Sequence, residues 1–108
     1  MQPELRQSIE AELANAERAR LDKNEGKARV CARRAAGLAA REFLIKRGAH
    51  LRKDSVYETL KTLASWPGLS MDLRTAALHL TLQVTKEFTL PENIDLIAEA
   101  RNLIGGLG

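Results

Sequence analysis

Two side chains that could do chemistry lie five residues apart in the stretch Arg74-Thr-Ala-Ala-Leu-His79. A fixed guanidinium can stabilise charge on a transferring phosphate, and an imidazole with a pKa of about 6.5 can move protons. Five positions on a straight helix correspond to a rotation of about 140°, so the two side chains do not share a face. The spacing predicts a poor site within one chain and a better one across a dimer interface; the alternative is an ordinary packed histidine.

Basic side chains gather in a different stretch, residues 27–53, which holds nine of the seventeen basic residues and one acid, Glu42. One interpretation is a surface for phosphates of RNA or of a nucleotide. The other is a solvated face on which acids of residues 4–17 form salt bridges with the arginines. The candidate nucleic-acid-binding residues are Arg29, Arg33, Arg34, Arg41 and Arg47.

Ligand-binding motifs are otherwise scarce. The sequence has no glycine-rich phosphate loop and no nucleophile elbow. One cysteine and two distant histidines do not supply the four ligands of a structural metal site. We therefore expect neither a metal nor a cofactor.

The cellular compartment is indicated by the cysteine content and the N-terminus. Cys31 is the only cysteine and cannot form an internal disulfide, which is typical of a small buried side chain in a reducing environment. The N-terminal residues lack the charged and apolar regions of a signal peptide, and no apolar run reaches membrane-spanning length. We expect a soluble cytoplasmic protein without a membrane partner.

An all-α fold must position these residues. Alanine and leucine dominate, aromatic residues make up 4% of the chain, and β-branched residues are sparse. A chain of 108 residues fits one domain, 1–108, built as a five-helix up-and-down bundle. The spacing of apolar residues predicts helices over 3–20, 27–47, 55–66 and 70–88, and a fifth that follows 89–92 and stops at Gly105-Gly106.

The limits of these helices follow from capping and breaking residues. Serine, threonine or asparagine begins a helix, whereas glycine and proline end one. The predicted helix starts are Pro3, Ser55 with Glu58, Ser70, and Thr89 with Glu92. The predicted breaks are Asn24 and Gly26 in the turn 21–26, Gly48, and Trp66-Pro-Gly68.

Apolar faces predict how the helices pack. Helix 27–47 has one apolar face of mostly small residues, which lets a neighbour approach closely, and a basic stripe on each side of this face. The face consists of Ala28, Cys31, Ala32, Ala35, Leu38, Ala39 and Phe43, and the stripes of Lys27, Arg34 and Arg41 and of Arg29, Arg33 and Arg47. Helix 70–88 has a main stripe, and Leu78 and Leu82 lie on a different face. A helix that is apolar on two sides is central or also faces another subunit, so we expect a homodimer through this helix or the last one. The main stripe consists of Leu73, Ala77, Leu80, Val84 and Phe88.

The first two predicted helices resemble the first half of a HEPN domain, and the five-helix pattern and the length fit such a domain over nearly the whole chain. The resemblance rests on a helix, a turn with glycine and an alanine-rich second helix, over Ala19–Ala28 and Ala32–Glu42. It implies a small all-α bundle, often dimeric and often paired with a minimal nucleotidyltransferase in a toxin–antitoxin system. Many HEPN domains are metal-independent ribonucleases with an arginine, a polar residue and a later histidine. The matching residues are Arg74, Thr75 and His79, with threonine where asparagine, aspartate or histidine is usual.

Two functions are therefore open. The first is a HEPN-like module associated with RNA or a nucleotide, as half of a toxin–antitoxin pair, with ribonuclease potential at Arg74 and His79. The alternative is a non-catalytic helical adaptor that pairs with another protein, supported by the two apolar faces of helix 70–88. The sequence does not decide whether the protein is an enzyme.

Overall fold

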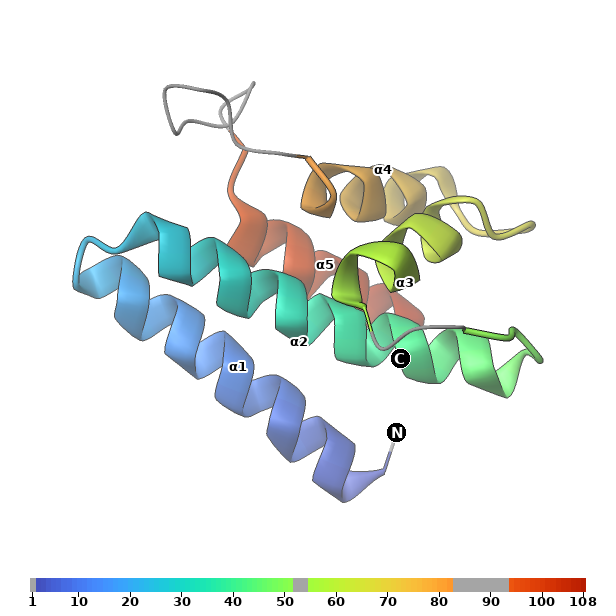
Figure 1. The fold of residues 1–108 in the computed structure, drawn as a ribbon, viewed down its shortest axis with the longest axis horizontal. Helices are drawn as coiled ribbons and strands as arrows, with labels where there is room; N and C mark the ends of the chain where they lie inside the picture. Colours follow the sequence, from blue (N-terminus) through green and yellow to red (C-terminus); the bar gives the residue numbers. More distant parts are fainter. Residues whose placement is uncertain (1, 52–54, 83–93) are drawn as a thin grey trace.

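A computed structural model describes residues 2–51, 55–82 and 94–108. These residues form five helices and no strand, which confirms the all-α prediction (Figure 1). None of the helices in these three ranges is long and apolar enough to span a membrane. The helices are α1 (Pro3–Leu21), α2 (Glu25–Lys46), α3 (Val56–Ala64), α4 (Met71–Leu80) and α5 (Leu96–Leu107).

Helix α2 is the centre of the arrangement. It packs against α1, α3 and α5, whereas α4 packs against α3 and α5. Figure 1 shows α1 and α2 as a hairpin whose helices diverge away from their connecting turn, with α5 behind α2. Helix α1 contacts the rest of the bundle mainly through α2, with a small contact to α5. The segment after α2 turns back over this helix toward α3, and its residues Ala49 and Leu51 pack against the core (Figure 1).

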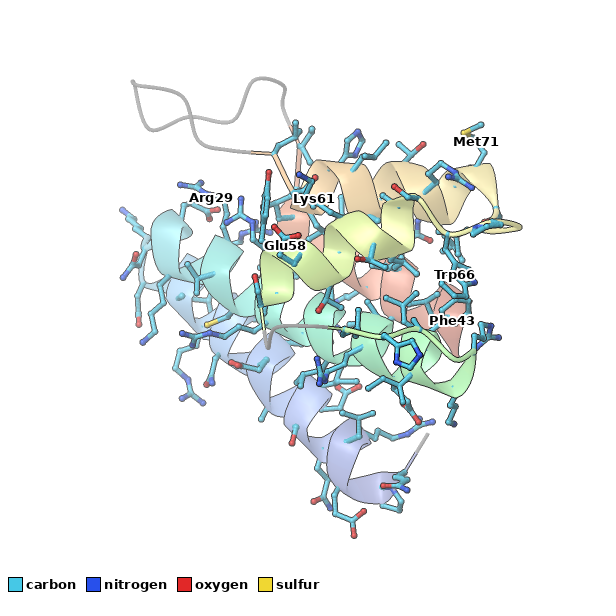
Figure 2. The ribbon with its side chains drawn as sticks, turned by 45° about the vertical axis from the view of Figure 1, so that its right-hand side comes forward. Arg29, Phe43, Glu58, Lys61, Trp66 and Met71 are labelled. Carbon is cyan, nitrogen blue, oxygen red and sulfur yellow. The ribbon has the colours of Figure 1, made fainter. Side chains whose placement is uncertain are left out.

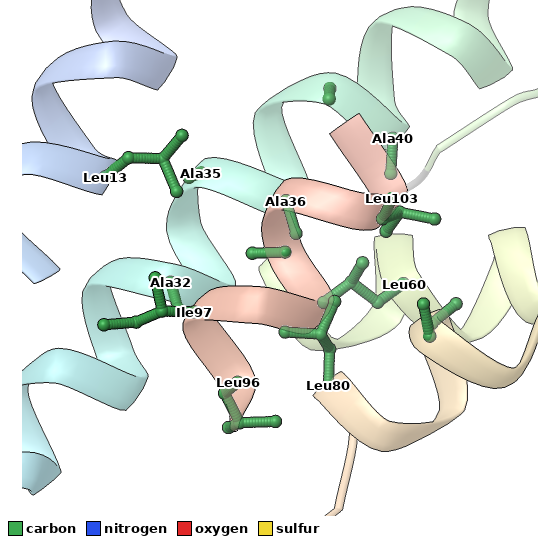
Figure 3. Close-up of a cluster of buried hydrophobic side chains, with 14 of the residues drawn as sticks. Leu13, Ala32, Ala35, Ala36, Ala40, Leu60, Leu80, Leu96, Ile97 and Leu103 are labelled. Carbon is green, nitrogen blue, oxygen red and sulfur yellow. The ribbon is translucent and has the colours of Figure 1, made fainter. Parts of the chain in front are cut away.

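The small residues of α2 explain its central place. The predicted apolar face is incomplete, because Ala36, Gly37, Ala40 and Leu44 are also buried and bring α3 and α5 close. At Gly37 an added Cβ would lie 3.0 Å from a methyl group of Val56 on α3. Leucines from the other helices fill the remaining core, as Figure 3 shows. A helix with neighbours on three sides needs small residues on three sides.

Asn24 fixes the turn between α1 and α2. Its N–H donates to the carbonyl of Ala19, and its side chain accepts from the N–H of Lys27 at the start of α2. Lys23 adopts a left-handed φ of 60°, in the position where glycine usually ends a helix. Gly26 was predicted as a breaker, and this is wrong: it lies in the first turn of α2.

Two further predicted limits are confirmed. Gly48 has a φ of 84° directly after α2, and its N–H donates to the carbonyl of Ile45. The N–H of Ala49 donates to the carbonyl of Leu44, so α2 ends in a Schellman motif. Ser55 begins α3, since its hydroxyl accepts from the N–H of Glu58.

The predicted limits of the last two helices are partly wrong. Helix α4 ends at Leu80 rather than near residue 88, and Val84 and Phe88 lie outside the described residues. Helix α5 begins after its cap, Asp95, so Ile94 precedes the helix, and the predicted capping box at 89–92 also lies outside the described residues. The predicted stop at 105–106 is wrong, because α5 continues to Leu107.

Candidate functional site

Arg74 ties α4 to the end of α3. Its half-buried guanidinium donates to the carbonyls of Ala64 at 2.7 Å, Trp66 at 3.1 Å and Leu69 at 3.4 Å. The last carbonyls of a helix have no partner within it, so an arginine from the next helix can satisfy them. The intervening turn is shaped by Gly68, which has a φ of 82°. The predicted catalytic arginine therefore caps the C-terminus of α3.

His79 faces a different element. Its buried Nδ1 lies 3.2 Å from Oε1 of Glu99 on α5, at ion-pair distance but without the angles of a hydrogen bond. The side chains of His79 and Glu99 are 28% and 25% exposed. Thr75, the third predicted residue, is exposed. One chain therefore does not bring Arg74 and His79 together, and a composite site between two copies stays a prediction.

Arg33 is a second arginine that caps a helix. Its Nε donates to the carbonyl of Leu80 at 2.8 Å, and its Nη2 donates to the carbonyl of Leu82 at 2.9 Å. Burial, with repulsion from Arg29, lowers the pKa of the Arg33 guanidinium from its usual value. This arginine from α2 satisfies carbonyls at the C-terminus of α4, so it is not free to meet a phosphate.

The remaining predicted nucleic-acid-binding arginines lie in different surroundings. Arg47 stacks on the ring of Phe43, 3.6 Å from its centroid, and donates to the carbonyl of the same residue. Arg41 is half-buried and engages neighbouring groups. Arg34 is exposed, whereas Arg29 is half-exposed near the start of α2 (Figure 2). These arginines therefore do not form one continuous exposed patch.

The salt bridges expected between α1 and α2 are mostly not found. Among the described residues neither Arg33 nor Arg34 pairs with an acid of α1. Glu17 instead lies 3.5 Å from Arg101 on α5. The one acid of α2 near the basic residues, Glu42, pairs with Lys46 at 3.0 Å. Much of the positive charge of α2 is thus not neutralised by α1.

Arg20 was not singled out by the sequence, yet it joins three helices. It pairs with Glu25 of α2 at 3.0 Å and with Asp95, the cap of α5, at 2.9 Å. Burial raises the pKa of Asp95, but hydrogen bonds from Arg20 and from the N–H groups of Ala98 and Ile97 outweigh it and hold this pKa below its usual value. An aspartate directly before an apolar run is a capping signal that sequence reading could have used.

Two hollows adjoin each other along α2. One, of about 150 Å³, lies between α2, the start of α3 and Glu12 of α1, and the other, of about 330 Å³, lies between the first turn of α1 and the C-terminal half of α2. Both are lined by Leu38 and Arg41, so we treat them as one surface, the α2 groove. Its lining residues are Gln2, Leu5 and Glu12 of α1; Arg34, Gly37, Leu38, Arg41, Glu42, Ile45 and Lys46 of α2; and Ser55, Val56 and Thr59.

The groove is mainly aliphatic with charged residues of both signs at its edges, since Glu12 and Glu42 line it together with the basic residues, and the sequence reading missed it. Leu5, Leu38 and Ile45 supply apolar surface, and Ile45 is 50% exposed. The signal in the sequence was the stripe Lys27, Arg34 and Arg41, but its neighbour Leu38 was assigned to the apolar face and Ile45 was assigned to no face. No group of three or more potential metal ligands occurs within the described ranges. No protein-family model matches the sequence, and neither a curated protein nor a solved structure matches the chain.

Proposed function

We propose that this chain is a cytoplasmic, non-catalytic helical interaction module that binds another protein in the α2 groove. The observation that carries the proposal is the groove itself: an aliphatic hollow of about 330 Å³ with an exposed isoleucine, Ile45, and charged residues of both signs at its edge. Exposed apolar surface of this kind, bordered by polar residues, is typical of interaction sites. Arg33 and Arg74 contribute to the fold through their bonds to helix carbonyls.

A second candidate is the HEPN-like, RNA-associated module with ribonuclease activity. It is favoured by Arg29 and Arg34, which pair with no acid among the described residues, and by the contact between His79 and Glu99. Dimerisation and a nucleotidyltransferase partner belong to this proposal, because the resemblance implies them.

The chemistry of the second candidate would rest on His79. Glu99 would orient the imidazole at Nδ1, so that Nε2 can accept the proton of a ribose 2′-hydroxyl. The phosphate would need a cation, and Arg74 would have to leave three carbonyls to supply it. Breaking these three hydrogen bonds would cost free energy, and the interaction module requires no such loss.

Incubation with RNA in excess EDTA separates the two candidates. We expect no cleavage of structured or unstructured RNA by the wild-type protein, since the side chain of Arg74 is bound to carbonyls at the end of α3 whereas that of His79 lies beside α5. If the protein is a ribonuclease, cleavage should appear and fall by about 10²–10⁴-fold in His79→Ala, as expected on loss of a general base. Thr81→Ala, at the end of the same helix, is the matched control.

The outcomes decide between the candidates. Cleavage that disappears in His79→Ala, with an unchanged circular dichroism spectrum and unchanged activity of Thr81→Ala, would contradict the interaction-module proposal. Cleavage that survives in both variants would come from a contaminating nuclease. The protein would then be purified further and the comparison repeated.

A further inference from the structure

The outer face of α4 carries exposed apolar side chains. Met71 is 72% exposed and Leu78 is 51% exposed, whereas Ala77 and Leu80 on the inner side of the same helix are buried. Figure 2 shows Met71 projecting away from the bundle. Thr75 is exposed as well, and spacings of four and three residues bring Met71, Thr75 and Leu78 onto one face of the helix. We call these three residues the α4 stripe.

The edge of α4 beside this stripe carries an acid at one end and a base at the other. Asp72 and His79 are seven residues apart, which is almost two turns, so they lie on the same edge of the helix. Asp72 is exposed, and no cation in ranges 2–51, 55–82 and 94–108 forms a salt bridge with it. The imidazole of His79 lies beside Glu99 and is partly exposed. One edge of the α4 stripe can therefore form charge pairs with another molecule.

A second copy of this chain supplies the matching groups. A two-fold axis that relates two antiparallel helices keeps the same edge of each helix on the same side. When two α4 stripes meet in this way, Met71 of one copy packs on Leu78 of the other, and Asp72 lies beside His79 of the other copy. The symmetry forms this acid–base contact twice. A parallel pair would instead bring Arg74 toward His79 of the other copy, which places two basic groups together.

Nucleic acid fits this surface less well. The α4 stripe contains neither a cation nor an aromatic side chain, so it offers nothing to phosphates or to stacked bases. The carboxylate of Asp72 would repel phosphates at the edge of the stripe.

We infer that two copies of this chain form a symmetric dimer through antiparallel α4 stripes, with Asp72 of each copy facing His79 of the other. None of the stripe residues lines the α2 groove, so the dimer presents two such grooves. Arg74 lies on the edge of α4 opposite His79, so this dimer does not assemble the predicted ribonuclease site. The inference goes beyond the proposed function and does not depend on it.

Sedimentation equilibrium over a wide range of protein concentrations tests the inference. The wild-type protein should change from monomer to dimer as its concentration rises, and the short contact should make the dimer weak. Leu78→Lys should raise the dissociation constant of the dimer by about tenfold or more, because it places an ammonium group in the apolar contact. Asp72→Lys should act in the same direction, because it puts two basic groups side by side.

Val30→Lys is the matched control, since Val30 is an exposed apolar residue of α2 outside the stripe, and the dissociation constant should not change. Circular dichroism spectra should show that all three variants keep the fold. Disulfide formation between mixed variants reports the orientation, because Cys31 is buried. Met71→Cys should crosslink with Leu78→Cys faster than either variant crosslinks with itself.

Three results would overturn the inference and leave the proposed function standing. They are a monomer up to the solubility limit, a dimer that Leu78→Lys leaves intact, and crosslinking of each cysteine variant mainly with itself. A dimer that Ile45→Lys dissociates and Leu78→Lys does not would place the second copy in the α2 groove. That result would contradict both the inference and the proposed function.

Discussion

Arg74→Ala should lower the free energy of unfolding by about 2–3 kcal/mol, a large share of the stability of a small domain. The substitution removes the guanidinium that meets the carbonyls of Ala64, Trp66 and Leu69. The carbonyl of Trp66 keeps the N–H of Leu69 as a donor, but those of Ala64 and Leu69 lose the guanidinium and carry a desolvation cost, and the end of α3 loses its connection to α4. Urea denaturation followed by circular dichroism measures the change.

Thr75→Ala is the matched control, because the neighbouring Thr75 is exposed and should change stability by no more than about 0.5 kcal/mol. Arg74→Lys should behave like Arg74→Ala, because an ammonium group does not reproduce the planar fork that reaches several carbonyls. If Arg74→Ala were as stable as the wild type, the guanidinium would be dispensable to the fold, and a role for Arg74 on a substrate would regain support.

Gly106→Ala should be less stable than Gly105→Ala by about 1 kcal/mol, because both gain the same helix propensity but only position 106 forces an extra carbon into a packed contact. A Cβ at this position would overlap Cδ2 of Leu73 on α4. Leu73 packs against the core, so either its side chain or the end of α5 must shift. The midpoint of thermal unfolding reports the effect.

The adjacent glycine is a close control. A Cβ at Gly105 would meet nothing within 4 Å, and alanine favours a helix over glycine by up to about 1 kcal/mol. Gly105→Ala should therefore leave stability unchanged or raise it slightly. Equal destabilisation by both substitutions would contradict the close approach of α5 to Leu73 and would favour the helix stop predicted from the sequence.

Local signals in the sequence predicted most helix limits. Ser55 and Ser70 cap α3 and α4 through their own hydroxyl groups, and Gly48 supplies a left-handed residue after α2. These features depend on a few neighbouring residues, so they can be read directly. The end of α4 depends on Arg33, which lies 47 residues before Leu80 and binds its carbonyl. A periodic apolar pattern contains no information about such a contact.

The candidate site was harder to predict for a related physical reason. A guanidinium binds helix carbonyls and phosphates through the same N–H donors, so residue type and spacing do not separate a capping arginine from a phosphate-binding one. Arg33 caps the C-terminus of α4, and Arg74 caps the C-terminus of α3. The α2 groove was missed because it arises from the divergence of α1 and α2, which sets Leu38 and Ile45 partly outside the core.

The most direct test of the account is a map of backbone amide chemical shifts during separate titrations with a helical peptide selected for binding to the protein and with RNA. The account predicts that the peptide shifts amides of the α2 groove, including Leu5, Leu38 and Ile45, while those of Thr75 and His79 stay unchanged. RNA should produce no saturable shifts at physiological salt. Saturable shifts at Thr75 and His79 on addition of RNA, with an unperturbed groove on addition of the peptide, would contradict it.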